Sequence, residues 1–81
     1  MTVCYLMKNN IYLNNRGTSY YYREDYQTAI KYFQKVIDLV EGYDDMSFEL
    51  NLGRLNLGDC YLQLNMVDLA VKYINECQRF F

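Results

Sequence analysis

Few side chains in this sequence are of types that could do chemistry. Histidine is absent from all 81 residues, which removes the commonest general base and the commonest zinc ligand. Cysteine occurs at three widely spaced positions, Cys4, Cys60 and Cys77, without a Cys-x-x-Cys pair. This pattern indicates neither a disulfide framework nor a metal site, and free cysteine behaves as a small apolar residue. We therefore expect three buried, reduced thiols, and a chain that has no catalysis of its own, no cofactor and no metal.

Charged and aromatic clusters do not suggest a catalytic or nucleic-acid site either. The carboxylate pairs Glu24-Asp25 and Asp44-Asp45 fall in expected turns, where acidic residues cap helices or face solvent. Eight basic and ten acidic residues give a net charge of −2, and the basic residues are too dispersed to form a phosphate-binding stripe. The run Tyr20-Tyr21-Tyr22 lacks the interleaved arginines of a base-stacking platform. We expect no binding of nucleic acid by this chain.

The composition is that of one small globular domain. Hydrophobic residues make up 52% and charged residues 22% of the chain, too apolar a balance for disorder. No apolar run approaches the ~18 residues that a membrane span needs, and the first residues lack the basic stretch of a signal peptide. We expect a single cytoplasmic domain over residues 1–81 that does not associate with a membrane.

The sequence contains an internal repeat. A shift of 41 positions aligns residues 11–40 with residues 52–81 without a gap, and apolar positions keep their phase. The identical pairs are Asn15 with Asn56, Gly17 with Gly58, Tyr20 with Tyr61, Ala29 with Ala70, Lys31 with Lys72, and Tyr32 with Tyr73. Two copies of one supersecondary unit are therefore expected, unit one at about 5–40 and unit two at about 46–81.

Each unit is expected to be a pair of helices. Apolar residues recur at steps of three and four over 26–40 and again over 67–81, which predicts two amphipathic helices. A further helix is expected ahead of each, roughly at 5–22 and 46–64. The connections at 23–25 and at Asn65 are short enough to force antiparallel hairpins, and Gly42 suits the end of a helix. The predicted fold class is all-α, with no strand.

The repeated glycines suggest close packing of helices. Glycine inside a helix costs about 1 kcal/mol relative to alanine, so its recurrence at Gly17 and Gly58 calls for a physical reason. Each is followed twelve residues later by an alanine, Ala29 or Ala70. We predict that Gly17 lies against Ala29 and Gly58 against Ala70 at the closest crossing of each hairpin.

At five positions in each unit, the sequence resembles the tetratricopeptide repeat family. A small residue, an aromatic three later, an alanine nine further, and apolar residues four and three further form the pattern of that family. The matching residues are Gly17, Tyr20, Ala29, Phe33 and Val36, and then Gly58, Tyr61, Ala70, Ile74 and Cys77. The spacing of 41 exceeds the family's period of about 34, and the proline that often ends a unit is missing. The extra residues amount to about two helical turns.

The resemblance implies two stacked hairpins that bind a protein or peptide in a groove lined by the first helix of each unit. Carried onto this sequence, the groove residues are Ile11, Asn14, Asn15, Thr18, Tyr21, Tyr22, Leu52, Leu55, Asn56, Asp59, Leu62 and Gln63. The lysine-rich clamp by which some members bind acidic chain ends is not matched, because Asn14 and Leu55 are uncharged and Asp59 is acidic. The alternative is that these residues only pack against neighbouring helices or face solvent.

A second function class is self-association. The stripe of the last helix continues to the end of the sequence, and no polar-faced helix follows to cover it. We expect either that the chain is a fragment of a longer array in a larger regulatory or signalling protein, or that two copies form a homodimer. The residues expected to be buried in such a homodimer are Ile74, Cys77, Phe80 and Phe81.

Overall fold

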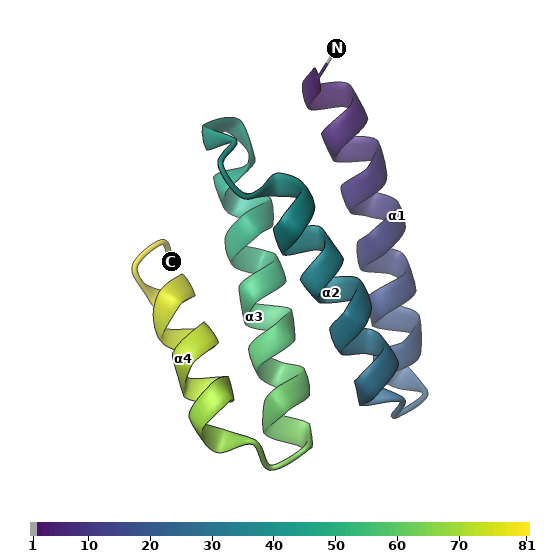
Figure 1. Cartoon of the computed structure of the whole chain (residues 1–81), viewed down its shortest axis with the longest axis vertical. Coiled ribbons are helices and arrows are strands. Elements are labelled where there is room, and N and C mark those ends of the chain that lie inside the picture. Colours follow the sequence, from purple (N-terminus) through teal and green to yellow (C-terminus); the bar gives the residue numbers. More distant parts are fainter. Residues whose placement is uncertain (1) are drawn as a thin grey trace.

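Four α-helices follow one another in the computed structural model, which describes residues 2–81 (Figure 1). They are α1 (Thr2–Tyr22), α2 (Tyr26–Val40), α3 (Ser47–Gln63) and α4 (Val67–Gln78), with a short 3-10 helix, η1 (Asp44–Met46), before α3. No strand occurs within the described range. The predicted all-α fold of two antiparallel hairpins is confirmed.

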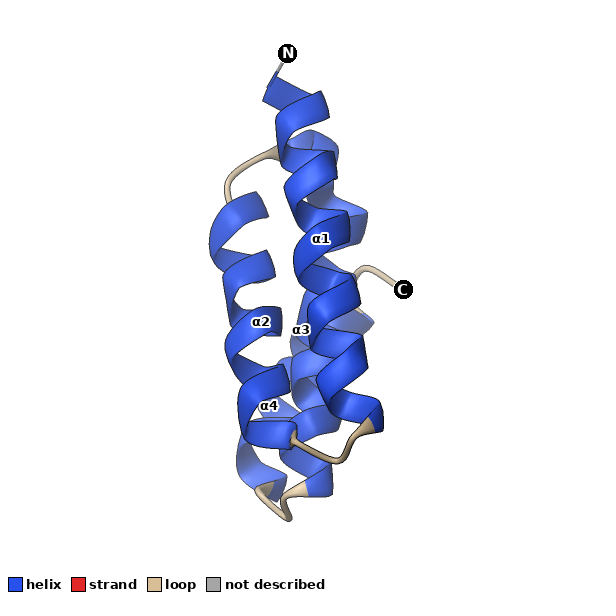
Figure 2. Ribbon diagram, turned by 90° about the vertical axis from the view of Figure 1, so that its right-hand side faces the viewer, coloured by secondary structure: helices blue, strands red, loops and turns tan. Residues whose placement is uncertain are grey.

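The two hairpins stack through α2 and α3. Within each unit the two helices pack along their lengths, α1 on α2 and α3 on α4, and α3 also packs on α2. Figure 2 shows α1 and α3 on one side of the molecule and α2 and α4 on the other. The first helices of the two units therefore share one surface.

The two hairpin turns have the same geometry, 41 residues apart. Glu24 and Asn65 both adopt the left-handed backbone conformation, with φ of 62° and 60°. The amide of Glu24 donates to the carbonyl of Tyr21 at 2.9 Å, and the amide of Asn65 donates to that of Leu62 at 3.0 Å. The internal repeat thus extends to the backbone hydrogen bonds that close each helix.

Local signals fix the ends of α2. The Asp25 carboxylate accepts from the amide of Thr28 at 3.3 Å and caps the first turn. Gly42, with φ of 89°, follows the helix in a conformation that side chains disfavour. Asp44 and Asp45 lie exposed in η1, and neither carboxylate caps α3.

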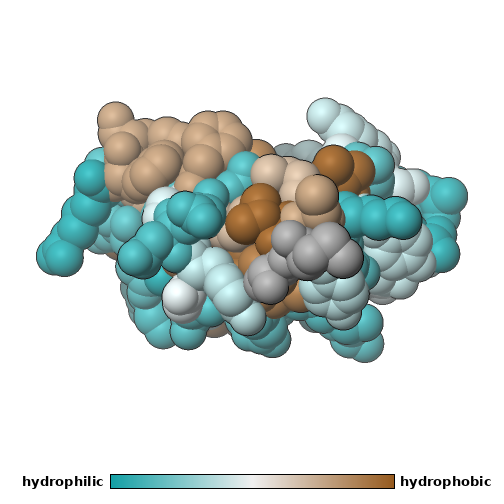
Figure 3. Space-filling view, turned by 90° about the horizontal axis from the view of Figure 1, so that it is seen from above, coloured by the Kyte–Doolittle hydropathy of each residue, from teal (hydrophilic) through white to brown (hydrophobic). Residues whose placement is uncertain are grey.

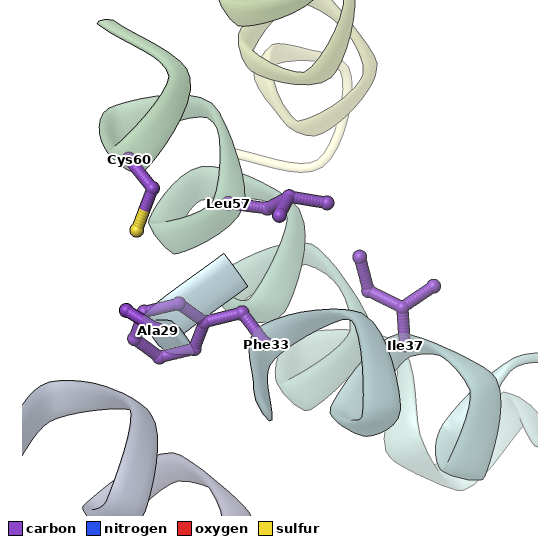
Figure 4. Close-up of a cluster of buried hydrophobic side chains, with 5 residues drawn as sticks. All are labelled: Ala29, Phe33, Ile37, Leu57 and Cys60. Atoms are coloured by element: carbon purple, nitrogen blue, oxygen red, sulfur yellow. The ribbon is translucent and has the colours of Figure 1, made fainter. Parts of the chain in front are cut away.

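The core lies between α2 and α3. Figure 4 shows Ala29, Phe33 and Ile37 of α2 facing Leu57 and Cys60 of α3, and all five side chains are buried. Phe33 is the largest of them and reaches across to α1. The predicted stripe on 26–40 is thus the one that forms the core.

The glycines allow close packing, although one of them does not face the expected residue. A Cβ on Gly58 would lie 3.3 Å from the carbonyl oxygen of Ala70, as the sequence suggested, and 3.0 Å from Ile74. A Cβ on Gly17 would instead lie 2.7 Å from the ring of Phe33. The atoms nearest to Gly17 are therefore those of the Phe33 ring rather than those of Ala29, because the ring fills the space that the glycine leaves.

A pair of stacked tyrosines connects the two helices of each hairpin. Tyr20 stacks on Tyr32 with ring centroids 5.6 Å apart, and Tyr61 stacks on Tyr73 at 5.8 Å. Both pairs join the first helix of a unit to its second. This contact gives a physical reason for two of the six identities between the repeats.

Two helix ends differ from the predicted ones. The first helix begins at Thr2 rather than near Tyr5, and the last ends at Gln78 rather than at Phe81. The amides of Phe80 and Phe81 both donate to the carbonyl of Cys77, which turns the chain away from the helix axis. The aromatic rings of these last residues then pack on Phe48.

The cysteines divide into one exposed and two buried thiols. Cys60 and Cys77 are buried as expected, but the expectation for Cys4 was wrong, because Cys4 lies on the outer side of α1. Burial raises the pKa of Cys60 to about 12, so its reactive thiolate form is suppressed near neutral pH.

We expect one rapidly reacting thiol per folded chain. Under native conditions a disulfide reagent such as dithionitrobenzoate should modify Cys4 within seconds to minutes, while Cys60 and Cys77 react only after denaturant unfolds the helices. Cys4→Ser should abolish the rapid phase and leave the slow one. Rapid modification of two or three thiols in the native protein would contradict the packing of α3 against α2 and α4.

Candidate functional site

The predicted groove residues all lie on α1 and α3, the two helices that share one side of the molecule (Figure 2). Half-buried members are Asn14, Tyr21, Leu52, Asn56 and Asp59. Exposed members are Ile11, Asn15, Thr18, Tyr22, Leu55, Leu62 and Gln63. None of the twelve is fully buried, so each has at least part of its side chain at the surface.

A pocket of about 170 Å³ lies where the C-terminal half of α1 faces α3. It brings together predicted residues from both units, and Phe33 of α2 lines it as well. The lining residues are Thr18, Tyr21, Tyr22, Phe33, Asn56 and Asp59. Phe33 reaches this position only because Gly17 leaves room for its ring under α1.

The polar contact within this pocket joins the two units. The Tyr21 hydroxyl on α1 and the Asp59 carboxylate on α3 both line the pocket. Interaction with this carboxylate, followed by partial burial, raises the pKa of Tyr21 to about 12. Tyr21 therefore remains a neutral hydrogen-bond donor over the whole physiological range of pH.

Comparison with known families agrees with the geometry. The sequence pattern of the tetratricopeptide repeat matches residues 11–43 and residues 53–80, which correspond to the two hairpins. The chain belongs to the tetratricopeptide repeat family. It has two repeats of that family, as the sequence suggested. The residues between the two matches form η1 and the first turns of α3, so part of the additional length of the repeat lies there.

One curated relative shares part of this sequence. The chain is 33% identical over 60 residues to the anaphase-promoting complex subunit CDC16 of Saccharomyces cerevisiae. The similar region covers 74% of this chain but only 7% of that protein. No solved structure gives a match.

The first helix of each unit carries a buried asparagine that sequence reasoning missed. Asn10 and Asn51 lie 41 residues apart, and each is only 6% exposed. Asn10 accepts from the side-chain amide of Asn14 at 2.7 Å, and Asn51 donates to the carbonyl of Ser47 at 2.8 Å. Extending the internal alignment by one residue toward the N-terminus would have found this pair.

The residues predicted for self-association separate into an inner and an outer set. Cys77 is buried inside the second hairpin, and Ile74 is half-buried against Gly58. Phe80 and Phe81 are exposed, and with Phe48 they form a cluster of three aromatic rings. Figure 3 looks down onto this end and shows hydrophobic side chains gathered on the left, the side where α4 lies in Figure 1.

A wider hollow of about 580 Å³ lies between α3 and α4, away from the groove. Two of its charged side chains pair with each other, because Arg54 contacts Glu76 at 3.3 Å, and Arg54 also donates to the side-chain oxygen of Asn51. The remaining lining residues are Asn75, Arg79 and Phe80. Neither this hollow nor the groove gathers three metal-ligating side chains within the described part of the chain. Over residues 2–81, no helix combines the length and the apolar character that crossing a membrane requires.

Proposed function

We propose that this chain is a protein-interaction module of a larger regulatory protein, and that it binds a segment of its partner in the groove between α1 and α3. The observation that carries this proposal is the pocket in which Thr18, Tyr21 and Tyr22 of one unit face Asn56 and Asp59 of the other. Half-buried amide and hydroxyl groups beside aromatic rings can satisfy a peptide backbone and also provide apolar contact area. The module needs no catalytic group for this role.

Two further observations support the proposal. The similar region in CDC16 belongs to a protein that is, by its name, a subunit of the anaphase-promoting complex, so a homologous segment exists in a multi-subunit assembly. The three cysteines of this chain are all free, which suits a reducing compartment such as the cytoplasm. A regulatory scaffold in the cytoplasm is therefore the setting that we propose.

Substitutions in the groove should weaken partner binding without unfolding the chain. Peptides selected on the immobilised protein from a displayed library of random linear peptides provide the probe. Tyr21→Ala, Asn15→Ala and Asn56→Ala should each weaken the selected peptides by about threefold to tenfold, because each removes a hydrogen-bonding side chain from the groove.

Asn75→Ala is the matched control, since Asn75 is an exposed asparagine on α4. Circular dichroism should show unchanged helicity for all four variants. If the selected peptides bind all three groove variants as tightly as the wild type, the proposed site is wrong.

Self-association through α4 is the second candidate, and the internal repeat favours it. Position by position, Val71 of α4 and Phe81, which follows that helix, correspond to Ile30 and Val40 of α2. Ile30 packs against the core that α2 forms with α3, and Val40 is fully buried, whereas Val71 and Phe81 are exposed. The face of α4 is thus equivalent to a face that is covered by a helix in the first unit.

The outer face of α1 is not suited to cover this surface. On α3, Gly53 packs so closely on α2 that a Cβ added to this glycine would lie 3.2 Å from Val36. The equivalent residue on α1 is the much larger Tyr12. Arg16 of α1 is the equivalent of the buried Leu57 of α3. Arg16 is exposed, and its Nε donates a 3.3 Å hydrogen bond to the hydroxyl of Tyr12. Head-to-tail stacking of copies would bury this bulky polar pair.

We therefore propose that any homodimer forms by pairing of two α4 helices about a two-fold axis. In an antiparallel pair centred near Ile74, Asp68 of one copy lies level with Arg79 of the other, and Lys72 lies level with Glu76. The charge pattern of α4 is thus complementary to itself. The proposed contact surface contains Val67, Val71, Ile74, Phe80 and Phe81, and it omits the buried Cys77.

A further inference from the structure

The groove pocket holds a single charged group. Of its six lining residues, only Asp59 is ionisable to a carboxylate, and no arginine or lysine lines the pocket. An ionised carboxylate offers about four acceptor positions, and the single hydroxyl of Tyr21 beside it could use only one of them. The pocket therefore retains negative charge and unused acceptor capacity facing the groove.

Two aromatic rings, those of Tyr21 and Tyr22, stand beside this charge. Tyr21 packs edge to face against Tyr22, with centroids 5.6 Å apart, and against Tyr26 at 5.4 Å. These contacts hold the rings without closing the pocket. The faces of tyrosine rings attract cations, most strongly where water is partly excluded.

At four other tyrosine rings, the cation is a side chain of the protein itself. Arg16, Arg23, Lys35 and Lys72 each lie over a tyrosine ring, on Tyr12, Tyr20, Tyr32 and Tyr73 respectively. Within residues 2–81, no cation of the chain occupies the faces of Tyr21 and Tyr22. These two rings and the Asp59 carboxylate, which line one pocket, thus offer a place where a cation from outside can bind.

We propose that the pocket is a socket for one arginine side chain of the bound partner. A planar guanidinium can donate two parallel hydrogen bonds to the Asp59 carboxylate and stack on a tyrosine face, which the compact ammonium of lysine cannot do. The volume of about 170 Å³ suits a single side chain rather than a longer segment. Phe33 closes one wall and contacts the aliphatic part of that side chain. This inference rests on the proposed function, because it names what the groove recognises.

Titration with small probes tests the socket directly. N-acetyl-arginine N-methylamide should shift the backbone amide signals of Thr18, Asn56 and Asp59 in nuclear magnetic resonance spectra. It should bind about threefold to fivefold more tightly than the corresponding citrulline compound, which has nearly the same shape without the charge. Asp59→Asn and Asp59→Thr should remove this preference, and the second variant carries the residue found at the equivalent position of unit one, Thr18.

Asp68→Asn, which changes an exposed carboxylate on α4, should keep the preference for arginine. Equal binding of the two probes, no binding of either, or a preference that survives both Asp59 variants would overturn the socket. The selected peptides would still report whether the groove binds a partner at all. The opposite outcome is also informative. If the preference for arginine depends on Asp59 but the selected peptides bind the groove variants as tightly as the wild type, the arginine socket is supported and the wider groove function is rejected.

Discussion

Phe33→Ala should lower the free energy of unfolding by about 3–5 kcal/mol, the range for deletion of a buried aromatic ring. Phe33 is 3% exposed and contacts three parts of the fold, since it lies in the core with α3, reaches α1 at Gly17 and lines the groove pocket. A small domain has a total stability of only about 5–15 kcal/mol, so this loss should move the urea midpoint strongly. The matched control is Phe48→Ala, because Phe48 is 52% exposed and should cost much less.

The effect of Gly17→Ala should change sign with the size of residue 33. In the wild type the added methyl group would lie 2.7 Å from a ring carbon of Phe33. The resulting overpacking should cost about 1–3 kcal/mol, more than the ~1 kcal/mol that alanine gains over glycine in a helix. In a Phe33→Val background the ring is absent, so Gly17→Ala should stabilise the chain. Urea unfolding of the four proteins in this cycle measures the coupling, and the same sign in both backgrounds would contradict the close contact between Gly17 and the ring.

Periodicity predicted the helices because each helix has one face buried. The apolar steps over residues 26–40 coincide with α2 as observed, since that stripe forms the core with α3. The same stripe on α4 led us to extend that helix to Phe81, three residues too far. Spacing alone could not show that Phe80 and Phe81 leave the helix to pack on Phe48, because this contact joins distant parts of the chain.

The faces of the groove could be predicted, but the pocket could not. Residue spacings of three and four predicted that Thr18 and Tyr21 share one face of α1 and that Asn56 and Asp59 share one face of α3. Which of these residues meet depends on how far α3 is shifted along α1, and that shift follows from the packing of α3 on α2. The contribution of Phe33 was hidden as well, because spacing paired Gly17 with the small Ala29 rather than with the larger ring.

The isolated chain should form a dimer at micromolar concentration, and Val71→Glu should make it monomeric. Val71 is 48% exposed midway along α4, on the face whose counterpart on α2 is covered by α3. A glutamate there would place a carboxylate of each copy inside the apolar contact, level with Glu76 of the other copy. Desolvation and mutual repulsion should weaken the dimer by about 2–4 kcal/mol. Sedimentation equilibrium over a range of concentrations measures the change.

The control for this experiment is Val3→Glu, a change of the same kind at a valine on α1 that is 46% exposed. It should leave the dimer intact, because the proposed interface lies wholly on α4 and the residues next to it. A two-fold pairing also uses the same face of both copies, so association must stop at two chains. Growth beyond a dimer would instead require α1 of one copy to stack on α4 of the next, with Tyr12 and Arg16 buried in the contact. A wild-type chain that stays monomeric, or a mass that keeps rising with concentration, would therefore reject the two-fold arrangement.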